Sequence, residues 1–149
     1  MLHFAYGSNL SPKFLRKYCP NASYMMKAIL PNFRVEFRHF SERRQGGISS
    51  IIPYPGELTR GVIYEIPKDE MLRLDEVESV HQGLYARETF LVFGEDEELY
   101  RADLYRVVEP QGPYTPAKSY IGLMLEGAEE HGLDPDYVQK LRRLYDSLS

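Results

Sequence analysis

Apolar and polar residues alternate over much of the first two thirds of the chain, as they do in β-strands. The apolar run at residues 2–5 predicts a short buried strand. Partial alternation at residues 28–40 and at residues 58–66 predicts two further strands, each with one buried face. This part of the chain is therefore expected to form a sheet.

Glycine and proline residues predict where these strands end. Gly46 and Gly47 predict a turn before the apolar run at residues 48–52, which predicts a strand of its own. Residues 53–56, with two prolines and a glycine, predict another turn directly after that strand.

A short helix and a hairpin are predicted next. Pro67 and the acidic residues that follow it favour a helix over residues 68–77, since negative charge in a first turn stabilises a helix. Residues 86–93 and 99–108 have the composition of strands, and the acidic turn at residues 94–97 separates them.

The last third of the chain predicts two helices. Thr115 as N-cap and Pro116 as first residue predict one helix, which Gly132 ends. Asp134 and Pro135 begin the other, which has an apolar face with a helical period. Because strands come first and helices late, we expect an α+β fold: a mostly antiparallel sheet or barrel flanked by helices.

Length and charge narrow the class of protein. The chain has 149 residues, 43% hydrophobic and 27% charged, which predicts a single globular domain over residues 1–149. Its formal charge of −4 and scattered basic residues argue against a nucleic-acid partner. Cys19 is the single cysteine and the four histidines lack a metal-ligand spacing, so no disulfide, metal or other cofactor is expected. Without a membrane-spanning apolar run or a signal-peptide pattern, a cytoplasmic protein is expected.

The segment at residues 4–10, Phe-Ala-Tyr-Gly-Ser-Asn-Leu, predicts a strand that runs into a tight turn. Ser11 as N-cap and Pro12 as first residue predict a helix immediately after it, with Gly7 free to adopt a positive φ. Backbone amides in such a turn face one point, where they can bind an anion or a polarised carbonyl oxygen.

A cluster of carboxylates follows the predicted helix at residues 68–77. Asp75, Glu76 and Glu78 cannot all lie on one helical face, so one or two at most can face a cleft. A solvated helix end is the common explanation of such a cluster. A functional carboxylate here would be a general base with a pKa raised by burial.

Together the two segments resemble the γ-glutamylcyclotransferase family, which includes γ-glutamylamine cyclotransferases and AIG2-like proteins. The resemblance extends in order over nearly the whole chain, through residues 4–10, 19–22, 46–47, 55–64, 74–85 and 127–133. It places the family's catalytic glutamate at Glu78. It implies an intramolecular reaction in which the substrate's α-amine attacks its γ-glutamyl carbonyl, releasing 5-oxoproline and an amine or amino acid.

The resemblance also implies roles for other residues. Glu78 would act as general acid and base, and the turn from Tyr6 through Gly7, Ser8 and Asn9 to Leu10 would bind the substrate. Tyr105 resembles a family tyrosine on a strand and is a candidate for substrate binding. Tyr120 resembles another, but its apolar stripe favours packing in the core. The family commonly has glycine after the glutamate; Ser79 stands there, and a negative φ would accommodate it.

Three matters stay open on the sequence. The substrate is expected to be a small γ-glutamyl compound, either a γ-glutamyl amino acid or a γ-glutamylamine. A non-catalytic binding or regulatory module on the same scaffold is the alternative to an enzyme. The stripe of Tyr137, Leu141 and Tyr145 fits either a core or a dimer face, so a monomer and a homodimer are both compatible with the sequence.

Overall fold

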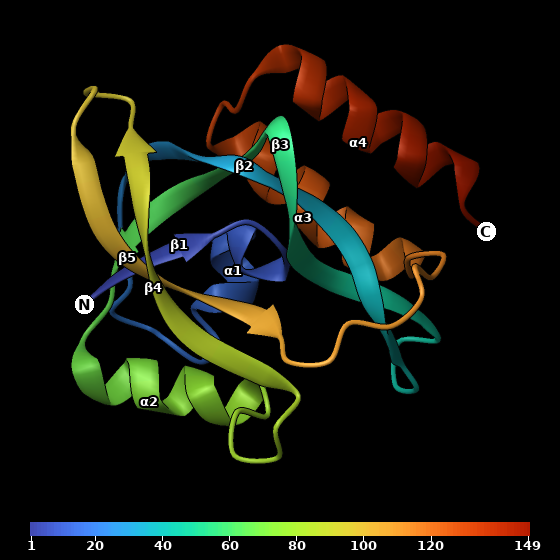
Figure 1. The fold of residues 1–149 in the computed structure, drawn as a ribbon, viewed down its shortest axis with the longest axis horizontal. Coiled ribbons are helices and arrows are strands. Elements are labelled where there is room, and N and C mark those ends of the chain that lie inside the picture. The colour runs from blue at the N-terminus through green and yellow to red at the C-terminus, as the bar shows by residue number, and fades with distance from the viewer.

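Five strands form a closed barrel in the order β1-β3-β2-β4-β5. In this computed structural model, which describes residues 1–149, the strands are β1 (Leu2–Ala5), β2 (Ser23–Ser41), β3 (Gly46–Glu65), β4 (Tyr85–Gly94) and β5 (Leu99–Val107). All neighbouring strands are antiparallel except β1 and β5, which meet in parallel at the single register pair His3 and Asp103. The expected α+β fold with a mostly antiparallel barrel is confirmed (Figure 1).

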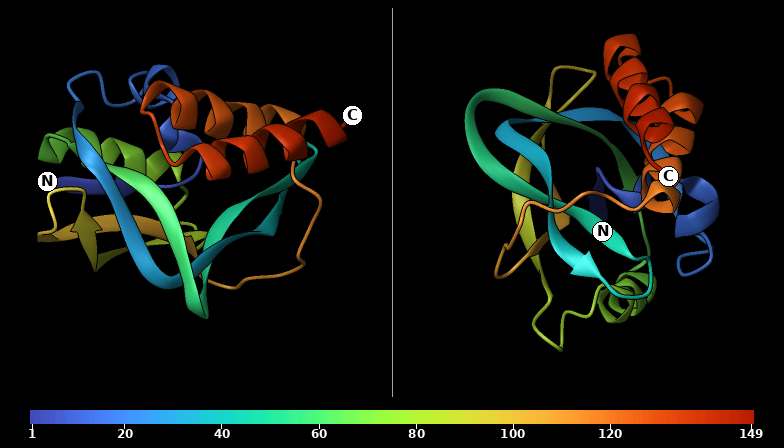
Figure 2. Two further views of the ribbon diagram at one scale, coloured as in Figure 1. Left: turned by 90° about the horizontal axis from the view of Figure 1, so that it is seen from above. Right: turned by 90° about the vertical axis from the view of Figure 1, so that its right-hand side faces the viewer.

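Helices cover the barrel on two sides. They are α1 (Pro12–Leu15), which follows the 3₁₀ turn η1 (Ser8–Leu10), α2 (Lys68–Val77), α3 (Lys118–Glu130) and α4 (Pro135–Ser147). Figures 1 and 2 show α3 and α4 side by side on one side of the barrel, with α2 on another. None of these helices combines the length and the apolar composition needed to span a bilayer.

The core has two parts, because the strands β1 and β3 bury both of their faces. Phe4 and Ile63 point into the barrel, whereas their neighbours Ala5, Val62 and Tyr64 pack toward the helices. This double burial explains why the sequence shows near-continuous apolar runs at these positions.

The turn predicted at residues 53–56 is wrong, because β3 continues through it. The pairs Phe33–Pro53 and Pro31–Leu58 enclose four residues on β3 against one on β2, Asn32, so the pairing is interrupted by an irregular bulge. Asn32 Oδ1 accepts a hydrogen bond of 3.0 Å from the amide of Gly56. The prolines bend the strand here without ending it.

The helix predicted from Thr115 begins later than expected. Ala117 is the N-cap of α3, and Pro116 forms a bridge with Gly47 on β3. The predicted end is confirmed, since Gly132 follows the helix with φ of 66°.

The Asp134 N-cap of α4 is also confirmed, because its Oδ1 accepts from the amides of Asp136 and Tyr137. On α4, Leu141 is buried and Tyr137 and Tyr145 pack against the core.

Candidate active site

The turn after β1 brings three short elements together. β1 ends at Ala5, η1 covers Ser8–Leu10, and α1 begins at Pro12. Ser11 Oγ accepts a hydrogen bond of 3.2 Å from the Phe14 amide, which confirms Ser11 as an N-cap. The predicted strand, turn and helix are therefore present, with a 3₁₀ turn between strand and helix.

Gly7 is required for space rather than for a positive φ. Its φ is −111°. A Cβ at this position would collide with Ser49 Oγ and would lie 2.7 Å from the hydroxyl oxygen of Tyr120. The absence of a side chain thus lets two hydroxyl groups approach the backbone of the turn.

The backbone amides of residues 7–10 were expected to face a ligand. Two of these four amides donate hydrogen bonds within the protein instead. The Leu10 amide donates to Gly7 O at 3.0 Å, and the Ser8 amide donates to the Tyr120 hydroxyl at 3.3 Å. The amides of Gly7 and Asn9 have no acceptor in the protein. These two are the donors that a ligand in the turn could use.

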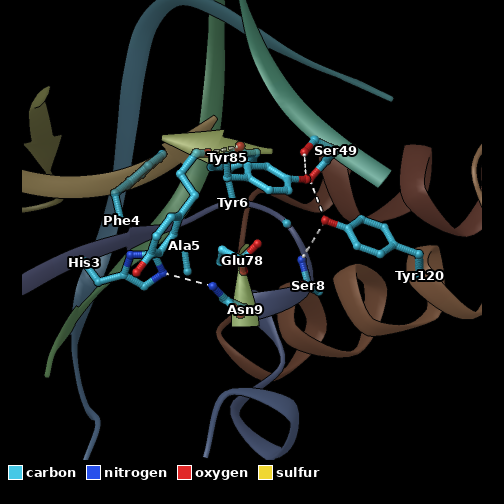
Figure 3. A pocket seen from close by; sticks show the side chains of 12 residues that line it. His3, Phe4, Ala5, Tyr6, Ser8, Asn9, Ser49, Glu78, Tyr85 and Tyr120 are labelled. Atoms are coloured by element: carbon cyan, nitrogen blue, oxygen red, sulfur yellow. Dashed lines mark hydrogen bonds between the residues drawn. The ribbon is translucent and has the colours of Figure 1, made fainter. Parts of the chain in front are cut away.

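A narrow cavity opens beside the turn (Figure 3). It is a small pocket: the empty space between its atoms is about 280 Å³, open solvent at its mouth included. Its lining brings together distant parts of the chain: His3, Phe4, Ala5, Tyr6, Gly7, Ser8, Asn9, Ser49, Glu78, Tyr85, Tyr105 and Tyr120. Of the residues proposed for the site from the sequence, only Leu10 lies outside this lining, because its side chain is buried in the core.

Glu78 reaches the cavity because it caps the C-terminus of α2. Its amide donates to Leu74 O at 2.9 Å. Burial raises the pKa of its carboxyl to about 7, with a smaller contribution from the negative charge of Asp75; the side chains of Asn9 and Arg44 oppose the rise.

The residue after Glu78 has a backbone conformation that the sequence did not predict. Ser79 has φ of 53°, in the left-handed region that favours glycine, so the negative φ that would accommodate a serine here is not the one adopted. The chain leaves α2 at this residue, so the conformation of Ser79 directs the segment that follows Glu78.

The other two carboxylates of the cluster lie elsewhere. Glu76 is exposed, as a solvated helix end requires. Asp75 is buried and accepts hydrogen bonds of 2.6 Å from the Tyr105 hydroxyl and 3.1 Å from Arg87. Arg87 also pairs with Asp103 at 2.6 Å. Asp75 therefore fixes Tyr105, which lines the cavity, and is itself held by an ion pair.

Tyrosines form much of the cavity wall. The expected core packing of Tyr120 is confirmed, and its hydroxyl, 2.7 Å from Ser49 Oγ, also lines the cavity. Tyr85 donates to Ser49 O at 2.5 Å. The Tyr6 hydroxyl donates to the carbonyl of Tyr105, so it is engaged by the backbone.

Reasoning from sequence missed Ser49, Tyr85 and His3 as cavity residues. The available signal was strand alternation, which places His3 on the same side of β1 as Ala5. Two other candidates lie outside the lining: His81 is exposed, and Cys19 is buried with its Sγ 3.5 Å from Glu70 O.

Comparison with known proteins shows the same family over nearly the whole chain. The model of the AIG2-like family matches residues 59–141. The γ-glutamylcyclotransferase of Mus musculus is 31% identical over 147 residues, covering 96% of this chain and 78% of the mouse protein. The Homo sapiens protein of the same name is 30% identical over 148 residues, with the same coverage of 96% and 78%.

The fold is also similar to that of solved structures. A solved γ-glutamyl cyclotransferase structure superposes with a TM-score of 0.90 at 29% identity, covering 95% of this chain and 86% of that one. The cavity, the turn and Glu78 thus lie on a scaffold shared with enzymes of that name. The chain belongs to the γ-glutamylcyclotransferase family and is an enzyme of this class.

Proposed function

We propose that the protein converts a small γ-glutamyl compound into 5-oxoproline and an amine or amino acid. The observation that carries this proposal is the position of Glu78, with a pKa raised to about 7, in the same cavity as the unpartnered amides of Gly7 and Asn9. One small cavity thus offers a proton acceptor and oxyanion donors together.

Glu78 acts first as the base. The α-ammonium of the substrate loses a proton to the Glu78 carboxylate, and the neutral amine attacks the γ-carbonyl carbon. A base with a pKa near the working pH is present as carboxylate in a useful fraction and also returns the proton readily. Burial of Glu78 therefore suits it to both halves of the reaction.

The turn stabilises the intermediate. Attack gives a tetrahedral carbon with a negatively charged oxygen, to which the Gly7 and Asn9 amides can donate. Collapse breaks the bond to the leaving nitrogen, which receives the proton from Glu78. The regenerated Glu78 carboxylate then takes the second proton from the ring nitrogen and passes it to the released amine. The five-membered ring closes within the substrate, so no covalent enzyme intermediate and no cofactor are required.

The size of the cavity indicates how the substrate lies. Because the cavity is small and open at its mouth, we place the γ-glutamyl group in it and the remainder of the substrate at the opening. The walls of Tyr6, Tyr85, Tyr105 and Tyr120 hold this group folded, which favours ring closure by proximity. We propose that the enzyme works in the cytoplasm, as a monomer or a homodimer.

Replacement of Glu78 tests the proposal. The Glu78→Gln variant keeps the shape of the side chain but cannot accept a proton, so 5-oxoproline release should fall by about 10²- to 10⁴-fold. Release would be measured with a panel of γ-glutamyl amino acids and γ-glutamylamines.

The matched control is Glu76→Gln, since Glu76 is exposed two residues earlier and lies outside the cavity. It should stay within about twofold of the parent. Equal turnover by Glu78→Gln and the parent would remove Glu78 from the mechanism, and absence of 5-oxoproline with every substrate would overturn the proposed function.

A further inference from the structure

His3 lies behind the turn, where the barrel closes. Its main chain forms the one register pair between β1 and β5, opposite Asp103, and its side chain is 1% exposed. The ring packs edge-on against Tyr105 at 5.7 Å. No step of the proposed reaction uses this histidine, although it lines the cavity.

The hydrogen bonds of His3 determine which of its nitrogens carries the proton. Nδ1 lies 3.0 Å from the carbonyl oxygen of Asp103, which can only accept, so Nδ1 is the protonated nitrogen. Nε2 of the neutral ring is then an acceptor, and it lies 3.3 Å from Nδ2 of Asn9 (Figure 3).

This tautomer sets the orientation of the Asn9 amide. Nδ2 faces His3 because Nε2 accepts, and the opposite orientation would place two acceptors against each other. Asn9 is 7% exposed, and its Oδ1 has no hydrogen-bond partner. A buried acceptor without a donor is unfavourable. Its presence in a cavity wall points to a donor supplied by a ligand.

We propose that His3 is a positioning residue that holds the Asn9 amide so that Asn9 Oδ1 accepts an N–H of the substrate's α-ammonium beside Glu78. The inference rests on the proposed function, because that function supplies the ammonium. Two acceptors then share this group: Glu78 takes one proton, and Asn9 Oδ1 retains a hydrogen bond to the resulting amine, which directs its lone pair at the γ-carbonyl.

The proton and the bonds balance in this arrangement. Two protons leave the α-nitrogen in turn: Glu78 takes one before attack and gives it to the leaving nitrogen, then takes the second from the ring nitrogen and passes it to the released amine. The new bond joins the α-nitrogen to the γ-carbon, and the bond from that carbon to the leaving nitrogen breaks. His3 and Asn9 neither gain nor lose a proton.

The acid limb of the pH profile of kcat/KM gives a readout that is specific to the pKa of Glu78. Asn9 lowers the pKa of Glu78 by donating to its carboxylate, so a disordered Asn9 should raise that pKa. The other ionisable groups that act on Glu78 come from the surrounding elements: Tyr6, Arg44, Asp75, Tyr85, Tyr105 and Tyr120. Burial lowers the pKa of His3 to about 4, with Asp103 and Arg87 as its charged neighbours, so His3 stays neutral over an assay range of about pH 5.5–9.

Four variants of the full chain test the proposal by 5-oxoproline release. His3→Phe keeps a ring but removes the acceptor for Asn9; it should lower kcat/KM by about 10- to 100-fold and move the acid limb to higher pH. His3→Gln keeps an acceptor and should restore most of both properties. Asn9→Leu should match His3→Phe, and the double variant should be no worse than Asn9→Leu alone.

His39→Phe, the same substitution on β2 outside the cavity, is the matched control and should leave the profile unchanged. Multiplicative losses in the double variant, or an unmoved acid limb in His3→Phe, would overturn the inference. Should His3→Phe not fold, ¹⁵N NMR of the parent decides: a ring protonated at Nδ1 agrees with the inference, and one protonated at Nε2 contradicts it.

These outcomes are separate from a failure of the proposed function. A parent enzyme that releases 5-oxoproline, depends on Glu78 and tolerates His3→Phe contradicts this inference alone. A parent that releases no 5-oxoproline contradicts the proposed function itself, while the NMR result still reports the tautomer.

Discussion

Glu78, the proposed general base, also affects the stability of the fold through its burial. Its pKa is about 7 in the folded protein because burial disfavours the carboxylate, against an ordinary value of 4.5. Below pH 4.5 the carboxyl is protonated in both folded and unfolded chains, so no penalty arises. As the pH rises from 4.5 to 7, the unfolded chain releases this proton while the folded protein retains it, so the folded state loses stability over this range.

We therefore expect Glu78→Gln to be more stable than the parent at high pH only. At pH 8.5 its free energy of unfolding should exceed that of the parent by about 2 kcal/mol, because glutamine has no charge to desolvate. At pH 4.5 the two should agree closely. Urea unfolding at both pH values measures the difference; a gain of equal size at both would mean that charge is not its cause.

At the scale of elements, a network of three charged residues holds α2 against the barrel. Arg87 on β4 contacts Asp75 on α2 at 2.9 Å and Asp103 on β5 at 2.6 Å. Thr89 also donates to Asp103, at 2.6 Å. Since Asp75 binds the Tyr105 hydroxyl, this group joins the helix that carries Glu78 to the wall of the cavity.

Removal of Arg87 should therefore destabilise the protein markedly. Arg87→Met leaves two carboxylates near each other without their cation, and we expect the free energy of unfolding to fall by about 2–3 kcal/mol. The control is Arg142→Met, whose pair with Glu129 is nearly half exposed and should contribute below about 1 kcal/mol. Urea unfolding compares the two, and equal losses would contradict a special role for Arg87.

Elements with strong local signals were predicted closely from the sequence. The helix at residues 68–77 and the hairpin agree with α2, β4 and β5, because capping residues and alternation act over a few neighbours. The bulge at residues 53–56 was not predicted, since pairing with β2 outweighs the turn preference of proline and glycine. The cavity contacts of Tyr120 and His3 were not predicted for the same reason: their partners lie far away along the chain.

At the scale of the whole molecule, the cavity is made of segments from almost the entire length of the chain. His3, Glu78, Tyr105 and Tyr120 belong to or adjoin β1, α2, β5 and α3. No contiguous piece contains the site, so the sequence could predict the turn and Glu78 separately but not the other walls. It was the resemblance to a known family that placed the turn and Glu78 in one site, because local patterns contain no information on distant contacts.

The single register pair between β1 and β5 has a consequence for how the enzyme folds. β1 pairs with β3 and β5, which lie much further along the chain. Because these pairings close long loops, they are expected to form slowly. In refolding from urea, we expect tyrosine fluorescence from the β4–β5 hairpin and helices to recover before 5-oxoproline release does. If activity returns together with the earliest fluorescence phase, the barrel closes first. If activity returns later, its recovery measures the rate of barrel closure, the last step of folding.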